Sequence, residues 1–151
     1  MGKKLTETID SKLKTAWQVV SRMYNAEAVL HGGTISMSHF LLNIDSHEGS
    51  YASDIAPRLG MESTSLSRII QSLEEKKLIQ RIPDKIDKRR IKIILTSKGK
   101  EQKELAKNIV RNFNQMVEVK IGKEKILELF KTIDKITELA EEKSRELRFK
   151  N

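Results

Sequence analysis

The sequence contains no cysteine, which excludes disulfides, thiolate metal sites and thiol-based peroxide sensing. It has only two prolines and few aromatic residues, 5% of the chain. No apolar run approaches the roughly 20 residues that a membrane-spanning helix needs. The amino-terminal segment also lacks the apolar core of a signal peptide. We therefore expect a cytoplasmic protein.

The motifs of common enzyme sites are also missing. The sequence shows no glycine-rich phosphate loop, no nucleophile paired with a base and no motif of paired carboxylates. We expect neither enzymatic activity nor a cofactor. His39 and His47 are two helical turns apart, with Asp45 and Glu48 close by, so a metal site is an alternative. Lone histidines are more often capping or surface residues, and we predict no metal site.

The positive charge is concentrated on one segment. The chain carries a net charge of +8, and its isoelectric point is near 9.7. Residues 62–103 hold 12 basic and 6 acidic residues, a net of +6, whereas residues 1–61 are balanced. A local excess of this kind is typical of a surface that binds a phosphate backbone.

Apolar spacing of three and four residues predicts six helices and one hairpin. The expected helices cover residues 5–30, 37–47 with Ser36 as its cap, 52–59, 63–76, 97–120 with Thr96 as its cap, and 123–148. The predicted fold class is therefore mainly α with a small β-hairpin wing (α+β). It is a winged helix-turn-helix flanked by long N- and C-terminal dimerisation helices. The apolar stripes of those terminal helices exceed what the small central unit can cover, which predicts a homodimer.

A helix-turn-helix is indicated by Ala56, Gly60 and Leu66. The motif needs a small residue where the two helices pass closely, which is Ala56 here. A turn glycine follows four residues later, at Gly60, and an apolar residue six residues after that, at Leu66. The alternative is an ordinary helical hairpin. The second helix would enter the DNA major groove, and its candidate contacts are Ser63, Thr64, Ser65, Ser67, Arg68, Gln71 and Ser72. The alternative is a solvated polar face, although serine and threonine fill an exposed helix poorly.

The hairpin after this helix carries a second group of candidate DNA contacts: Lys85, Asp87, Lys88, Arg89 and Arg90. Asp87 stands two residues before Arg89 and can hold its guanidinium at the loop tip. A fixed arginine of this kind suits a narrow minor groove, where the negative potential is enhanced. The alternative is that Asp87 only caps the turn.

These segments resemble one known family. Asp87-Lys88-Arg89-Arg90 followed by Leu95-Thr96-Ser97-Lys98-Gly99 is similar to the wing signature of the MarR family of bacterial regulators. Asp54-Ile55-Ala56, Leu59-Gly60 and Leu66-Ser67-Arg68 resemble that family's helix-turn-helix. The resemblance covers about residues 36–100.

The resemblance implies a homodimer that binds pseudo-palindromic double-stranded DNA, usually as a repressor. It places the wing arginine at Arg89, its supporting aspartate at Asp87 and the base-reading helix at residues 63–76. It also implies release by a small aromatic or phenolic ligand in a cleft between the dimerisation and DNA-binding parts. The cleft candidates are Trp17, Met23, Tyr24, Met37, His39 and Phe40.

Two residues depart from the family pattern. Lys77 stands where the family commonly has glycine, so we expect either an unusual positive φ there or a different end to the helix. Pro57 lies inside the first helix of the motif, where it removes one backbone donor and should bend the short helix unless it sits near the helix start.

By function, we expect residues 1–35 to form the N-terminal dimerisation helix, 36–96 the winged helix-turn-helix and 97–151 the C-terminal dimerisation helices. The rival interpretation is a basic membrane-surface or protein-interaction module without specific DNA binding. Because the charge lies on the hairpin and the adjoining helix, we favour DNA and expect no membrane partner.

Overall fold

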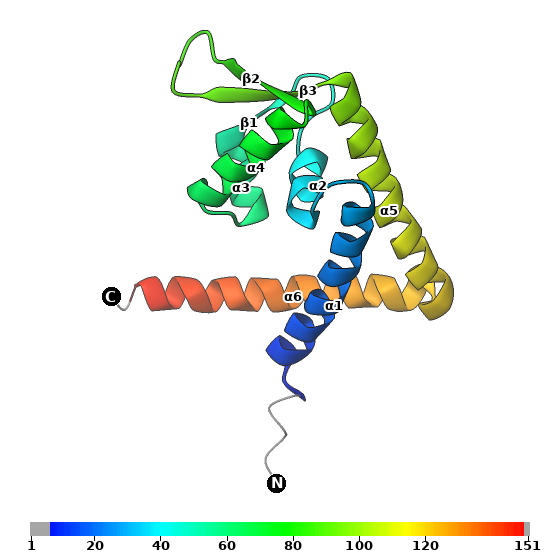
Figure 1. Cartoon of the computed structure of the whole chain (residues 1–151). Coiled ribbons are helices and arrows are strands. Elements are labelled where there is room, and N and C mark those ends of the chain that lie inside the picture. Colours follow the sequence, from blue (N-terminus) through cyan, green and yellow to red (C-terminus); the bar gives the residue numbers. More distant parts are fainter. Residues whose placement is uncertain (1–6, 150–151) are drawn as a thin grey trace. The chain divides into compact units, whose positions relative to one another are not determined.

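The structure is a computed structural model that describes residues 7–149. These residues form six helices and three strands (Figure 1). In order, they are α1 (Ile9–Leu30), α2 (Ile35–Leu42), β1 (Ser50–Tyr51), α3 (Ala52–Leu59), α4 (Ser63–Glu75), β2 (Ile79–Pro83), β3 (Ile91–Leu95), α5 (Ser97–Ile121) and α6 (Lys123–Arg148). The chain divides into two compact units after Ile109. The predicted fold class, mainly α with a small hairpin wing, is confirmed.

The first two helices begin and end at residues that differ from the prediction. The Thr8 hydroxyl accepts the Ser11 N–H at 3.4 Å, so α1 begins at Ile9, and the predicted start at residue 5 lies outside the described residues. Thr34, and not Ser36, caps α2, because its hydroxyl accepts the Met37 N–H at 3.2 Å.

The second helix also ends earlier than predicted, at Leu42 instead of residue 47. One carboxylate oxygen of Asp45 accepts the N–H groups of His47 and Glu48 at 2.8 and 2.7 Å. This local turn competes with the helix for the backbone donors, which is the usual effect of aspartate outside a helix interior. The same hydrogen bonds lower the pKa of Asp45.

The sheet has three antiparallel strands in the order β1-β3-β2. The β2–β3 hairpin was predicted, whereas the two-residue strand β1 was not; it pairs Ser50 with Ile93 and Tyr51 with Lys92. Gly49 makes this pairing possible. Its φ is 74°, and a Cβ atom there would lie 2.5 Å from the Ile93 carbonyl oxygen.

One hydrophobic core joins α2, α3, α4 and the sheet. Its fully buried large side chains are Phe40, Ile44, Ile55, Leu73, Ile79 and Ile93. Each such side chain contributes roughly 1.5–3 kcal/mol relative to exposure. This packing fixes the buried side of α4 and leaves its opposite face in solvent.

The start of α5 is held against the exit from α4. The Thr96 hydroxyl accepts the Gly99 N–H at 3.0 Å, which confirms Thr96 as the cap, and donates to the Lys77 carbonyl at 2.7 Å. A Cβ at Gly99 would lie 1.9 Å from the Leu78 carbonyl oxygen, so only glycine fits. At the other end, Gly122 has a φ of 99° and separates α5 from α6, as predicted.

A buried lysine ties α5 to the segment that follows α2. Lys103 is 7% exposed, and its amine donates to the Ile44 carbonyl oxygen. Burial lowers the pKa of Lys103, because a charged amine loses hydration there. The hydrogen bond compensates part of that loss and holds the first turns of α5 against the core.

Candidate nucleic-acid interface

The exposed face of α4 carries the predicted contacts. Leu66, Ile70 and Leu73 are buried, so their side of the helix faces the core. The other side exposes Ser63, Thr64, Ser65, Ser67, Arg68 and Gln71, while Ser72 is half-buried. Six of the seven predicted positions thus share one solvent-facing surface.

Two of these polar groups already have partners on α4. The Ser67 hydroxyl donates to the Ser63 carbonyl at 2.9 Å, and the Gln71 amide donates to a Glu75 carboxylate oxygen at 3.0 Å. The N-cap residue Glu62 makes no side-chain capping bond, which leaves the first N–H groups of α4 available to an anion. Gln71 must therefore leave Glu75 before it can bind a base edge.

The chain leaves α4 through Lys77, the position where the MarR family commonly has glycine. This residue has a φ of 59°, as predicted, and the Leu78 N–H bonds to the Leu73 carbonyl at 2.9 Å. The helix thus ends in a left-handed turn without glycine. Arg81 of β2 pairs with Glu74 at 2.5 Å, a contact that lowers the pKa of Glu74 and links the wing to α4.

Pro57, the second residue that departs from the family pattern, lies inside α3 without ending the helix. The helix continues through Pro57 to Leu59 and closes at Gly60, whose φ is 59°. The turn glycine predicted between the two helices of the motif is therefore in place, and α4 begins three residues later.

The wing loop presents cations at its tip. Lys85, Lys88 and Arg89 are exposed, and the Arg89 side chain retains 96% of its accessible surface. One carboxylate oxygen of Asp87 accepts the Arg89 backbone N–H at 3.0 Å and lies 3.9 Å from the guanidinium Nε. Asp87 therefore caps the turn and also stands beside the guanidinium, so both roles considered from the sequence are present.

Arg90 lies differently, at the base of the wing. Its guanidinium stacks 3.7 Å from the centroid of the Tyr51 ring and pairs with Asp54 of α3 at 3.5 Å. The Tyr51 hydroxyl donates to Asp84 at 2.5 Å. This bond, with two backbone N–H donors, lowers the pKa of Asp84 to about 2. Sequence reasoning missed Tyr51, Asp54 and Asp84, because no local pattern marks contacts between such distant segments.

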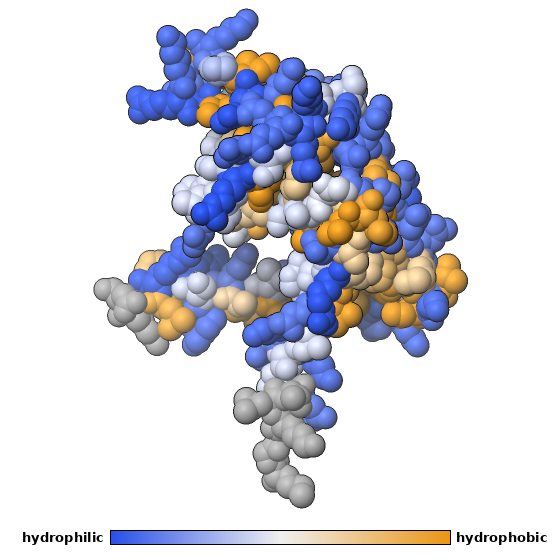
Figure 2. All heavy atoms as spheres, in the orientation of Figure 1, coloured by the Kyte–Doolittle hydropathy of each residue, from blue (hydrophilic) through white to orange (hydrophobic). Residues whose placement is uncertain are grey.

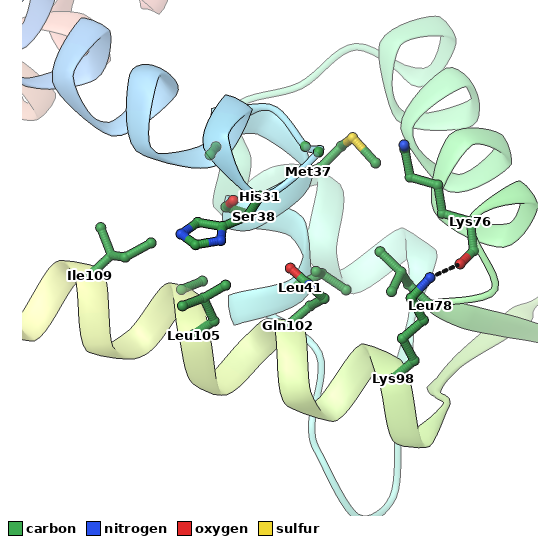
Figure 3. Close-up of a pocket in the computed structure, with 14 residues that line it drawn as sticks. His31, Met37, Ser38, Leu41, Lys76, Leu78, Lys98, Gln102, Leu105 and Ile109 are labelled. Carbon is green, nitrogen blue, oxygen red and sulfur yellow. Dashed lines mark hydrogen bonds between the residues drawn. The ribbon is translucent and has the colours of Figure 1, made fainter.

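A pocket of about 240 Å³ opens in the unit that holds the winged helix (Figure 3). Leu41, Leu105 and Ile109 form apolar walls, while Lys98 and Gln102 reach it from α5. The Lys98 amine donates to the Lys76 carbonyl at 3.5 Å, a long bond at the end of α4 (Figure 3). The pocket is therefore bounded by both the end of α4 and the first half of α5.

Of the six cleft residues predicted from the sequence, Met37 lines this pocket. Phe40 is fully buried in the core, and Met23 and Tyr24 are half-buried on α1. Trp17 stacks on His39, with ring centroids 6.2 Å apart, and burial lowers the pKa of His39. The residues that line the pocket come from α1, α2, the end of α4 and α5. Because these segments are distant in the sequence, no local sequence pattern could predict the pocket.

Among residues 7–149, no group of three or more histidine, aspartate or glutamate side chains is arranged to hold a metal ion. None of the helices described is both long enough and apolar enough to cross a membrane.

Comparison with known proteins agrees with this architecture. The model of the MarR family matches residues 34–91, the segment from α2 to the wing. No curated protein sequence matches the chain. The resemblance to the MarR family predicted from the sequence is thereby confirmed, with the family's domain at residues 34–91.

Solved structures extend the likeness beyond that segment. S. aureus MepR in complex with DNA is 22% identical, with a TM-score of 0.79, and the match covers 87% of this chain and 97% of MepR. The transcriptional regulator SlyA is 21% identical, with a TM-score of 0.78 and coverage of 89% and 94%. PcaV from Streptomyces coelicolor, solved with its natural ligand, is 16% identical, with a TM-score of 0.76 and coverage of 93% and 99%. The chain thus has the fold of MarR-family transcriptional regulators.

Proposed function

We propose that this protein is a homodimeric, sequence-specific DNA-binding regulator that represses transcription and is released by a small ligand. The observation that carries the proposal is the pairing of two exposed surfaces on one rigid core. These are the serine-rich face of α4 with Arg68 and the cationic wing tip with Arg89. The residue types suit major-groove reading and minor-groove insertion respectively.

The charge distribution supports a polyanionic partner. Figure 2 shows mostly hydrophilic side chains on the β2–β3 hairpin, with exposed apolar side chains such as Ile86 among them. The segment from residue 62 to 103, which forms α4, the wing and the first turns of α5, holds a net charge of +6 out of the chain's +8. Several phosphate contacts per protomer would make binding fall steeply with salt concentration.

The dimer is supported by apolar surface that one protomer leaves uncovered. No residue of α6 is buried, and Leu129, Phe130 and Leu147 are each about half exposed. Apolar residues of α1, including Leu13 and Trp17, are similarly exposed. A second copy would bury these stripes, so we assign residues 1–35 and 97–151 to dimerisation and 36–96 to DNA binding.

We place the effector site in the pocket of Figure 3. Its apolar walls suit an aromatic ring, and the Lys98 amine, held by one long hydrogen bond, can turn toward a carboxylate or phenolate. Because Lys76 ends α4, a ligand at this point would move the recognition helix relative to α5. The test measures release of DNA by a hydroxybenzoate, with the uncharged hydroxybenzamide as its control. Only the hydroxybenzoate should release DNA, and Leu105→Trp, which fills the pocket, should prevent that release. Release of DNA by both compounds, or by neither, would contradict this assignment.

Hydroxyl-radical footprinting on the DNA upstream of the protein's own gene tests the binding mode. Two protected segments about 10 base pairs apart on one face are expected, with protected minor grooves outside them. Protection spread evenly over any duplex would refute sequence-specific reading and favour a merely basic surface.

A further inference from the structure

The wing is fastened to the helix-turn-helix by a small polar cluster of Tyr51, Asp54, Asp84 and Arg90. We infer that Tyr51 is a positioning residue that orients the wing and so places Arg89 relative to α4. The DNA-binding consequence of this inference rests on the proposed function. Tyr51 belongs to β1, directly before α3, whereas Asp84 and Arg90 are the first and last residues of the wing loop.

Tyr51 contacts both ends of the wing loop. Its hydroxyl donates to one Asp84 carboxylate oxygen at 2.5 Å, and its ring lies under the Arg90 guanidinium at 3.7 Å. The two ends are also joined by the Asp84 N–H, which donates to the Arg90 carbonyl at 3.0 Å. One side chain thus holds the loop where it leaves the sheet and where it returns.

The Asp84 carboxylate, which accepts the Tyr51 hydroxyl, also accepts hydrogen bonds from the interior of the wing loop. Its second oxygen accepts the N–H groups of Ile86 and Asp87 at 2.8 and 2.9 Å. Asp87 in turn accepts the backbone N–H of Arg89 at 3.0 Å. A chain of hydrogen bonds therefore leads from the Tyr51 hydroxyl to the backbone of the tip arginine.

The cluster also reaches the helix-turn-helix itself. Arg90 pairs at 3.5 Å with Asp54, which lies in the first turn of α3. A short hairpin is marginally stable alone, so its direction depends on such anchors. Because α3 packs on the core that fixes α4, the cluster sets the relation between the two DNA-reading elements.

A double-mutant cycle tests this role. Tyr51→Phe keeps the ring and the stacking on Arg90 but removes the hydroxyl bond to Asp84. Operator affinity should fall about threefold to tenfold, the fold-change expected from one hydrogen bond. The loss should vanish in an Arg89→Ala background, because Tyr51 then has no tip arginine to place. It should persist in full in an Arg68→Ala background, since Arg68 belongs to α4.

An equal loss in both backgrounds, or no loss at all, would overturn the inference. A second readout needs no DNA: backbone ¹⁵N order parameters at Ile86 and Asp87 should fall in Tyr51→Phe while those of the buried Ile70 stay unchanged. If the parent bound no operator, the proposed function would fail, and the order parameters would still decide whether Tyr51 orders the wing. Unchanged order parameters at Ile86 and Asp87 in Tyr51→Phe would refute the positioning role of Tyr51.

Discussion

The carboxylate of Asp87 accepts the backbone N–H of Arg89 at 3.0 Å and stands 3.9 Å from its guanidinium, at the tip of the wing. The arginine head remains in solvent and is free to enter a groove. Its loop geometry is set in advance, which lowers the entropy lost when the tip is ordered on DNA.

Arg89→Ala should weaken operator binding by about tenfold or more, because it removes the cation that we propose enters the minor groove. The melting temperature should stay unchanged, since the side chain is exposed. Arg22→Ala is the matched control, because it removes the same charge from α1. Binding that weakens equally in both variants would show only a general electrostatic effect.

Wing order should depend on pH at the acidic end. Because hydrogen bonds hold the folded-state pKa of Asp84 at about 2, below its ordinary value of 3.8, its carboxylate stabilises the wing above about pH 4. That contribution is lost as pH falls through about 2. NMR amide shifts of Ile86 and Asp87 should therefore stay constant from pH 7 to 4 and move below that. Asp84→Asn should abolish this transition; a midpoint near pH 4 in the parent would contradict the account.

Gly99→Ala should destabilise the fold by about 3 kcal/mol, the upper part of the range for overpacking, because its Cβ would clash with the Leu78 backbone. Gly33→Ala is the control, since a Cβ there would lie 3.7 Å from the nearest atom, the Ala28 carbonyl oxygen, which is an ordinary contact. Urea denaturation followed by circular dichroism measures both. Equal stability of the two variants would mean that α5 does not need this close approach.

The proposed dimer depends on α6. Phe130→Lys and Leu129→Lys place charge on its apolar stripe and should shift sedimentation from dimer to monomer at micromolar concentration. Glu142→Lys makes a larger charge change on the opposite face and should leave the dimer intact. A parent that sediments as a monomer would exclude the dimer altogether.

Periodicity and turn chemistry were enough to predict α3, α4, the hairpin, the cap at Thr96 and the break at Gly122. The cap and the end of α2 were predicted wrongly, because the local sequence allows more than one choice at both places. Both Thr34 and Ser36 can cap a helix, and the backbone donors beyond Leu42 go to Asp45 instead of a continuing helix. The positive φ of Lys77 followed from a family pattern, because the sequence itself contains no glycine there.

The site was predictable only where its residues are consecutive. The α4 face and the wing tip each lie within one short segment, so their residue types revealed them. The Tyr51–Asp84 bond joins residues 33 positions apart, and the pocket takes residues from segments between Ala28 and Ile109 that are distant in the sequence. Such sites depend on tertiary packing, and neither spacing nor composition encodes them locally.

The most direct test of the central claim is fluorescence anisotropy with the DNA upstream of the protein's own gene and a scrambled duplex, over a salt series. We expect the upstream DNA to bind at least a thousandfold more tightly than the scrambled duplex, about the lower limit for specific sites, with affinity falling steeply as salt rises. Equal, weak and salt-sensitive binding to both duplexes would contradict it.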